Sequence, residues 1–169
     1  LNYSNDYPIY LFHKGENFKA YEFFGAHFTQ INGVKGVVFR TWAPNADIVS
    51  VVGDFNEWNA SANVMTRVSD GGVYEAFIKG VKEFDCYKFA ITHNGNTVLK
   101  SDPYAFHFET PSKTASKVYN LDGYNWKDSL FLESKSTPYN KPMNIYELNL
   151  GSWKKHDDGS YYTYNEYSS

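Results

Sequence analysis

The chain has 169 residues, of which 19% are aromatic and 21% charged, and its formal net charge is −3 at pH 7. This slightly acidic balance provides no attraction for nucleic acid or an anionic membrane surface, so neither is expected as a partner. No segment approaches the roughly 20 apolar residues that a membrane span needs, and the first residues lack the basic and apolar regions of a secretory signal. The single cysteine, Cys86, excludes an internal disulfide and favours a cytoplasmic location.

The first 28 residues show no clear structural period. They mix aromatic residues with His and Gly, and only Tyr21 to Phe24 give a weak helical pattern. Without strand alternation or a helical period, a segment is predicted to be irregular. Residues 1–28 are therefore expected to form an irregular lead-in.

Between Val34 and Tyr119, short apolar or alternating segments are separated by turn signals. Pro44 ends the first of them, because proline cannot donate a hydrogen bond to a strand ladder. The Asn94-Gly95 step favours a tight hairpin. No long helical period interrupts the series. The predicted strands are Val34–Trp42, Ile48–Val52, Val73–Ile78, Cys86–Thr92, Thr97–Leu99 and Ser116–Tyr119.

Short strands joined by Gly- and Asn-rich turns are typical of two packed antiparallel sheets. We therefore predict an all-β fold, an immunoglobulin-like β-sandwich over residues 29–121. Residues 122–142 are polar and contain two prolines, which predicts a linker with a short helix at Trp126 to Glu133. Residues 143–169 form a separate C-terminal segment, which opens with a strand pattern at Met143 to Leu150.

Two stretches of the sequence resemble a known family. Residues 36–46 read GVVFRTWAPNA and residues 51–58 read VVGDFNEW. They resemble the signature of the glucan-binding sandwich that precedes the catalytic barrel in branching enzymes. Debranching enzymes and the glycogen-binding domain of the AMP-activated kinase have related modules. Residues 142–153, PMNIYELNLGSW, are similar to the first barrel strand of bacterial 1,4-α-glucan (glycogen) branching enzymes.

Shorter matches to the same family occur in the same order along the chain. They are YEFFGAH at residues 21–27, KSDPYA at 100–105, PSKTAS at 111–116 and YNWKD at 124–128. The LGSW ending at residues 150–153 favours branching over debranching relatives, and the departure from the pattern is Asn149, where the family usually has His. The resemblance implies that residues 143–169 are the start of a truncated (β/α)8 barrel of the α-amylase type.

The resemblance also implies what the longer parent protein does. Branching enzymes cut an α-1,4 bond and form an α-1,6 branch with retention, using an Asp nucleophile and a Glu acid–base from later barrel strands. Such a barrel needs roughly 250 residues, so we expect this N-terminal fragment to contain no catalytic residue. No metal ligands and no cofactor motif are predicted either. The expected partners are α-1,4-glucan, as glycogen or a maltooligosaccharide, and the catalytic barrel of the same parent chain.

A glucan site needs a flat aromatic side chain for the apolar face of the sugar and polar groups for its hydroxyls. The resemblance places a sugar-stacking Trp at Trp58 and a hydroxyl-binding Lys at Lys88, and Asn56 and Glu57 are added as polar contacts. Each has an alternative interpretation: Trp58 folded over the sandwich edge, Lys88 as an ordinary outward lysine, Asn56 as a turn residue. The kinase-type site has a second stacking Trp near Thr97, where this chain has no aromatic residue.

Two other functions remain open at this point. The chain could be a standalone glycogen-binding module, or the sandwich could be a packing domain for the barrel that binds nothing. The segment Met143 to Trp153 distinguishes the first, because a standalone module has no use for a barrel strand. The absence of an aromatic residue near Thr97 favours the second. The residues interpreted as structural are Trp42, at the core or at the module–barrel interface, His27, Asp102 and Cys86.

Overall fold

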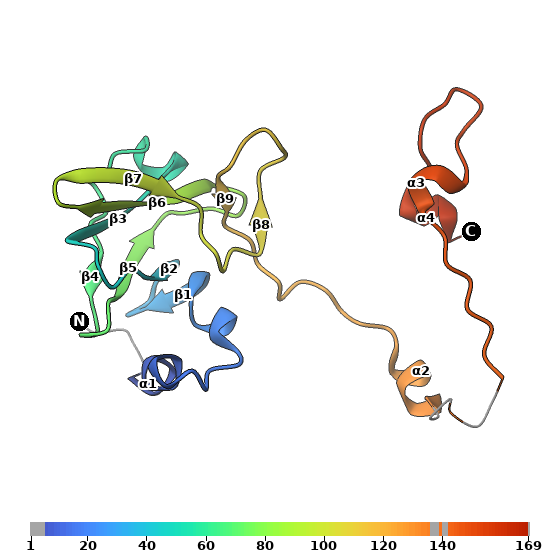
Figure 1. The fold of residues 1–169 in the computed structure, drawn as a ribbon, viewed down its shortest axis with the longest axis horizontal. Helices are drawn as coiled ribbons and strands as arrows, with labels where there is room; N and C mark the ends of the chain where they lie inside the picture. Colours follow the sequence, from blue (N-terminus) through green and yellow to red (C-terminus); the bar gives the residue numbers. More distant parts are fainter. Residues whose placement is uncertain (1–5, 136–138, 140–141, 169) are drawn as a thin grey trace. The chain divides into compact units, whose positions relative to one another are not determined.

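A computed structural model of the chain describes residues 6–135, 139 and 142–168. The chain divides into two compact units, residues 1–124 and 125–169 (Figure 1). The division falls inside residues 122–142, the predicted linker, of which residues 136–138, 140 and 141 lie outside the described part.

The first sheet of unit 1 has four antiparallel strands in the order β1-β2-β5-β4. Val38 in the centre of this sheet lies opposite His27 on one side and Phe77 on the other. Asn32 and Gly33 join β1 to β2 with φ angles of 50° and 82°, the left-handed pair that a two-residue hairpin favours. The strand bounds are β1 Gly25–Ile31, β2 Val34–Trp42, β4 Thr66–Arg67 and β5 Val73–Lys79.

The second sheet is built around β6, which pairs with β3 on one side and with both β9 and β7 on the other. β9 pairs at Cys86 and Tyr87, whereas β7 pairs from Phe89 onwards. The start of β6 therefore has different neighbours from its end. The bounds are β3 Ile48–Gly53, β6 Cys86–His93, β7 Asn96–Lys100, β8 His107–Phe108 and β9 Ser116–Lys117.

The hydrophobic core lies between the two sheets. Because side chains alternate along a strand, every second residue of β2, β3 and β6 faces the other sheet. These core residues, all buried, are Val37, Phe39, Val49, Val51, Tyr87 and Phe89. Figure 1 shows β3, β6 and β7 in one layer and β1, β2 and β5 in the other. The predicted all-β sandwich is confirmed.

A helix covers the outer side of the first sheet. α1 (Asp6–Lys14) buries Ile9 in a second apolar cluster, and the short 3₁₀ helix η1 (Ala20–Glu22) leads from it into β1. The Phe12 ring lies 4.4 Å from the ring of Phe24 and 5.6 Å from that of Trp42. Trp42 is half exposed, and its Nε1 donates to the carbonyl of Gly71 at 2.8 Å. In this structure Trp42 therefore has a packing role.

The N-terminal part is more regular than the sequence predicts. Residues 1–28 were expected to be irregular, but they contain α1 and the beginning of β1. β1 was not among the predicted strands, and the predicted boundary between residues 28 and 29 falls inside it. β1 is not recognisable from the sequence because His27 and Gln30 interrupt its apolar alternation. α1 is not recognisable because a helix of nine residues forms mainly through tertiary packing.

The long predicted strands of the sandwich all form. Val34–Trp42 has the predicted bounds, and the next four extend beyond the predicted ends by one residue. The last one is shorter, since β9 ends at Lys117 rather than Tyr119. β4 and β8 were not predicted, because a two-residue strand is too short to show a period.

The second unit contains three short helices, α2 (Ser129–Ser134), α3 (Leu150–Trp153) and α4 (Tyr164–Tyr167). The helix predicted at Trp126 to Glu133 forms with a later start. The strand predicted at Met143 to Leu150 is absent: residues 142–149 have no regular structure. A strand is stabilised by pairing with a neighbour, and no described strand pairs with this segment. None of the described helices combines the length and apolar character needed to cross a bilayer.

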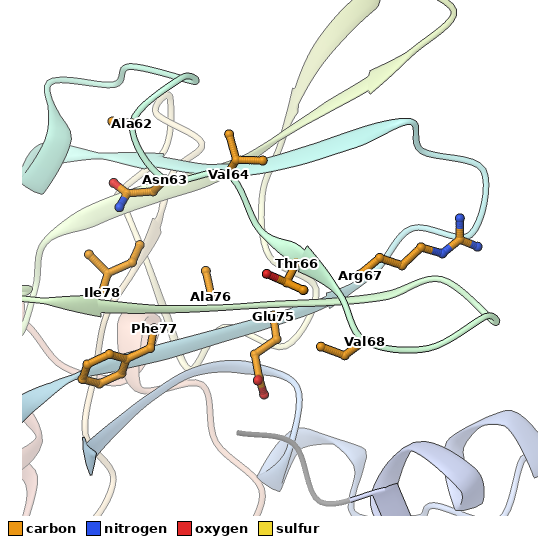
Figure 2. A pocket seen from close by; sticks show the side chains of 10 residues that line it. All are labelled: Ala62, Asn63, Val64, Thr66, Arg67, Val68, Glu75, Ala76, Phe77 and Ile78. Atoms are coloured by element: carbon orange, nitrogen blue, oxygen red, sulfur yellow. The ribbon is translucent and has the colours of Figure 1, made fainter. Parts of the chain in front are cut away.

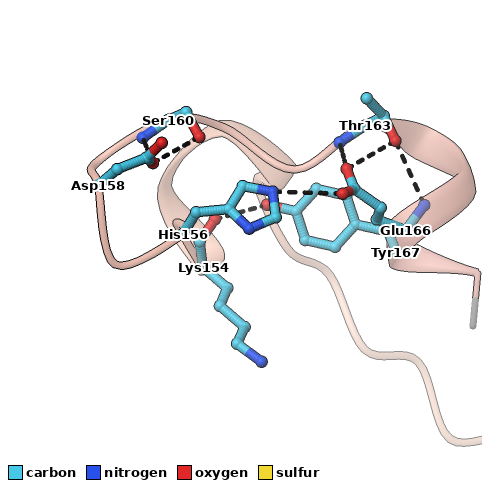
Figure 3. A network of polar contacts seen from close by, with 7 residues as sticks. All are labelled: Lys154, His156, Asp158, Ser160, Thr163, Glu166 and Tyr167. Carbon is cyan, nitrogen blue, oxygen red and sulfur yellow. Dashed lines mark hydrogen bonds and ion pairs between the residues drawn. The ribbon is translucent and has the colours of Figure 1, made fainter.

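Polar contacts hold the end of the second unit together (Figure 3). Thr163 caps α4: its Oγ1 accepts from the Glu166 amide at 3.4 Å, and Glu166 Oε2 accepts from the Thr163 amide at 2.6 Å. This backbone hydrogen bond lowers the pKa of Glu166. His156 Nε2 lies 3.4 Å from Glu166 Oε1, and the Tyr167 hydroxyl donates to the Lys154 carbonyl at 2.8 Å. These contacts join Lys154 and His156, which precede α4, to Glu166 and Tyr167 within it.

Candidate functional site

The turn after β3 has an unusual backbone. The 3₁₀ helix η2 (Asp54–Asn56) is followed by Glu57 and Trp58, whose φ angles are 55° and 60°. The left-handed region is uncommon for residues other than glycine and costs about 1–2 kcal/mol each. Two such residues in succession require the surroundings to hold the turn in place.

Asn56 provides that support. Its Oδ1 accepts from the Gly53 amide at 2.9 Å, and its Nδ2 donates to the Val51 carbonyl at 2.8 Å and to Asn63 Oδ1 at 2.7 Å. A side-chain amide has two N–H donors, and both are used here. The structure therefore gives Asn56 the positioning role that was its alternative interpretation.

Trp58 is fixed at both its backbone and its indole. The Trp58 amide donates to the Gly53 carbonyl at 3.0 Å, and Nε1 donates to Asp54 Oδ1 at 3.2 Å. Asp54 Oδ2 in turn accepts from the backbone amide of Cys86 at 2.8 Å. The ring remains 39% exposed. Asp54 thus ties a solvent-accessible indole to the first residue of β6.

Lys88 lies two residues further along β6. Tyr87 and Phe89 face the core, so Cys86 and Lys88 project from the outer face of the second sheet. Residues two apart on a strand are separated by about 7 Å, which places Lys88 close to the anchor of Trp58. Its Nζ donates to Thr114 Oγ1 at 2.6 Å. Trp58 and Lys88 are therefore brought to the same part of the sandwich.

Glu57 and Thr97 are the two other positions considered for sugar binding. Glu57 is exposed within the turn, and the described residues give its carboxylate no hydrogen-bond partner. Thr97 lies on β7, and its Oγ1 is 2.8 Å from the hydroxyl oxygen of Thr92. The resemblance to kinase-type modules predicts a second stacking ring near Thr97, and the structure has this pair of hydroxyls there.

Sequence reasoning did not select Asp54 or Thr114. Asp54 stands inside the GDFN segment, so a signal was present, although only the fold shows that its carboxylate orients the indole. Thr114 lies 26 residues from Lys88 in sequence, and no local sequence pattern predicts this contact. Cys86 remains structural: burial raises the pKa of its thiol, which disfavours a reactive thiolate.

A hollow of about 560 Å³ lies beside the same turn, between residues 62–68 and β5 (Figure 2). Three of its polar side chains, those of Asn63, Arg67 and Glu75, already have partners within the protein. Asn63 accepts from Asn56, the Arg67 guanidinium donates to two backbone carbonyls of the following turn, and Glu75 Oε2 lies 2.5 Å from Arg40 Nε. These contacts stabilise the fold, and we assign the hollow no ligand. Among the described residues, no group of three or more His, Cys, Asp or Glu side chains is placed to hold a metal ion.

Comparison with known proteins finds a family model that matches the sandwich and relatives that match almost the whole chain. The family model of carbohydrate-binding module 48 (isoamylase N-terminal domain) matches residues 23–105. The 1,4-alpha-glucan branching enzyme GlgB of Bacillus subtilis (strain 168) is 48% identical over 165 residues, 96% of this chain and 26% of the relative. The same enzyme of Geobacillus stearothermophilus is 50% identical over 164 residues, 95% of this chain and 26% of the relative.

A solved structure shares the fold. It is pullulanase type I from Bacillus subtilis str. 168, complexed with maltose, with a TM-score of 0.50 and 26% identity over 61% of this chain and 14% of that chain. This chain spans about a quarter of the length of the curated relatives that it matches. The resemblance recognised in the sequence is thereby confirmed. Residues 23–105, which include both the Trp58 turn and Lys88, belong to the carbohydrate-binding module 48 family, in a chain that matches the N-terminal part of bacterial 1,4-α-glucan branching enzymes.

Proposed function

We propose that the chain binds α-1,4-glucan and positions it for the catalytic part of a longer branching enzyme, and that it is not catalytic by itself. The observation that carries the proposal is the Trp58 turn. An exposed indole is held on a backbone with two consecutive left-handed residues, locked by Asn56 and aimed by Asp54. Strain of this kind is retained where a side chain has to be presented for function.

The geometry suggests how the site takes a sugar. The apolar C–H face of a glucose unit stacks on the indole of Trp58, because aromatic rings combine apolar area with a fixed orientation. The Lys88 ammonium has three donors, of which one is used by Thr114, so the others are left for sugar hydroxyls. Glu57 supplies an acceptor at the edge of the turn.

The parent enzyme would supply the chemistry. Its relatives are named branching enzymes, and retaining transfer requires a pair of carboxylates roughly 5 Å apart. We assign that pair to the part of the parent that follows this chain, with its catalytic barrel as the partner of the sandwich. We also propose a cytoplasmic location, because the one cysteine of the chain is a free thiol. The division of the chain at residues 28, 121 and 142 is part of the same proposal, with β1 assigned to the sandwich.

An amide NMR titration with maltoheptaose tests the site. Saturable shifts are expected on residues 54–58 and on Lys88, and Trp58→Ala should weaken binding at least about tenfold, which corresponds to roughly 1.4 kcal/mol. Trp58→Phe retains a smaller ring, so its affinity for maltoheptaose should lie between those of the unchanged chain and Trp58→Ala. Trp153→Ala, which removes a half-exposed Trp from the second unit, is the matched control and should not change affinity.

Two results would contradict the proposal. The absence of shifts at millimolar maltoheptaose would mean that the sandwich only packs against the barrel, the alternative that Thr97 favours. Release of branched product from amylose by the purified chain would contradict the assignment of catalysis to the rest of the parent.

A further inference from the structure

A second cavity of about 240 Å³ lies in unit 1, on a different part of the sandwich. It is bounded by β1, by η1 and by the segment after β9, and it shares no residue with the Trp58 turn or with Lys88. Its lining includes Tyr21, His27, Phe106, Tyr119, Asn120 and Asp122.

Aromatic rings form the walls of this cavity and are fixed by their neighbours. The Phe106 ring meets the His27 ring at 5.8 Å in an edge-to-face arrangement. The Tyr119 ring is 5.3 Å from that of His107 and 5.6 Å from that of Phe84. Rings held in this way offer pre-organised apolar faces to a ligand.

Polar groups without protein partners stand at the rim. Within the described part of the chain, the hydroxyls of Tyr21 and Tyr119 and the carboxylate of Asp122 have no hydrogen-bond partner. The side chain of Asn120 accepts from the Asp122 amide at 3.0 Å, which leaves its N–H donors available. The rim therefore combines donors and acceptors, as a ligand with several hydroxyl groups requires.

The charge of the lining excludes an anionic ligand. Burial lowers the pKa of His27, so its ring is neutral at pH 7. Lys19 Nζ lies 3.2 Å from Glu22 Oε1 and balances that carboxylate, whereas Asp122 has no such partner. The cavity therefore has no unpaired cation for a phosphate or carboxylate.

We propose that this cavity is a second saccharide site, which takes a single pyranose unit of an α-glucan independently of Trp58. The cavity volume corresponds to that of about eight water molecules in the liquid, at ~30 Å³ each. It suits one sugar ring rather than an extended chain. The inference rests on the proposed function. Two separate sites on one module would hold a glucan at two points, and linked sites raise the overall affinity through effective concentration.

The test is an NMR titration of the 169-residue chain with maltose and with maltoheptaose. In Trp58→Ala, saturable shifts should persist on His27, Phe106 and residues 119–122. Asp122→Ala should weaken binding at this set about tenfold, as expected for one hydrogen bond to a charged group, and should leave the shifts of the Trp58 set unchanged. Tyr21→Phe removes only a hydroxyl and should have a smaller effect of the same kind. Asp70→Ala, at another exposed carboxylate, is the control and should alter neither set.

The outcomes separate the two proposals. Shifts confined to residues 54–58 and Lys88 would overturn the second site and leave the proposed function standing, whereas shifts in neither set would overturn both. Choline is the competing probe, because aromatic walls beside a carboxylate also suit a quaternary ammonium ion. If choline binds this cavity more tightly than maltose does, the saccharide assignment is wrong. An unchanged amide spectrum and melting temperature in Asp122→Ala would exclude a folding defect as the cause of weaker binding.

Discussion

Asp102 is a buried carboxyl that links three parts of the sandwich. Its Oδ2 accepts from the Tyr87 hydroxyl at 2.7 Å and its Oδ1 from the Tyr104 amide at 2.8 Å, while its own amide donates to Ser116 Oγ at 2.8 Å. The residue is 1% exposed, and no cation is among these contacts. Burial raises its pKa from the ordinary 3.8 to about 6, although both accepted hydrogen bonds act in the opposite direction. Folding therefore makes protonation of Asp102 more favourable than it is in the unfolded chain.

This shift predicts how stability depends on pH. Because the folded chain binds the proton more tightly than the unfolded one, Asp102 adds stability below its ordinary pKa of 3.8, and the contribution is lost as the pH rises through about 6. The difference is on the order of 3 kcal/mol. Asp102→Asn resembles the protonated side chain, so the variant should lack this loss between pH 4 and pH 6.5. Urea unfolding of both proteins across that range measures the difference, and parallel curves would contradict the shift.

Trp58 and Lys88 could be selected from the sequence as candidate site residues, because each lies in or beside a recognisable motif. Asn56 was proposed as a polar contact, with a turn role as the alternative, and its side-chain hydrogen bonds in the structure are made to the turn and to Asn63. Asp54 and Thr114 could not be assigned their roles from sequence, because each acts on a residue of another element or loop. Residue type indicates chemistry, whereas partnership depends on the fold.

The connection between β4 and β5 depends on close packing at Gly72. Its φ is 88°, and a Cβ at this position would lie 2.2 Å from Pro44 Cα, a backbone atom that cannot turn aside. The Gly72 carbonyl also accepts from the Ala43 amide at 2.8 Å. This glycine therefore allows the ends of β2 and β5 to meet the segment that leads into β3.

Gly72→Ala is consequently expected to destabilise the sandwich by about 3 kcal/mol or more, as the sum of left-handed strain and overpacking. Gly80→Ala is the matched control, because Gly80 also has a positive φ, 79°, but no atom lies within 4 Å of its Cβ position. The control should cost only about 1–2 kcal/mol. Denaturant unfolding compares them, and equal losses would show that the contact with Pro44 is unimportant.

Strands with a clear apolar face could be predicted from the sequence. Strands whose formation depends on pairing with a neighbouring strand could not. β2 has its predicted bounds because alternation and Pro44 mark its whole length. β1 was missed because pairing along β2 stabilises it more than its own pattern suggests. The segment from Met143 to Leu150 has a strand pattern but no neighbouring strand among the described residues, and so it does not form one.

The two units differ in how much they bury. The sandwich has a core between its sheets, whereas none of the described residues from 125 onwards is buried. Protection from hydrogen exchange follows burial and cooperative hydrogen bonding. The stability of the two units should therefore be measured separately.

Amide hydrogen exchange should consequently separate them. The central amides of β2, β5 and β6 should exchange only through global unfolding, with opening free energies of about 5 kcal/mol or more. Residues 142–168 should exchange with opening free energies near about 1 kcal/mol or less. The internal reference is the same sample, and strong uniform protection of residues 142–168 in a monomer would contradict the distinction.

The sequence alone determined the fold class, the family and the position of the proposed stacking residue, because strand alternation, turn residues and the two motifs are local patterns. The tertiary structure decided the rest. It placed Asp54 between Trp58 and β6, Thr114 on Lys88, and the aromatic and polar walls of the second cavity around one space. These arrangements join different segments of the chain. Their contacts contribute to stability only when the packed sheets hold both partners in place.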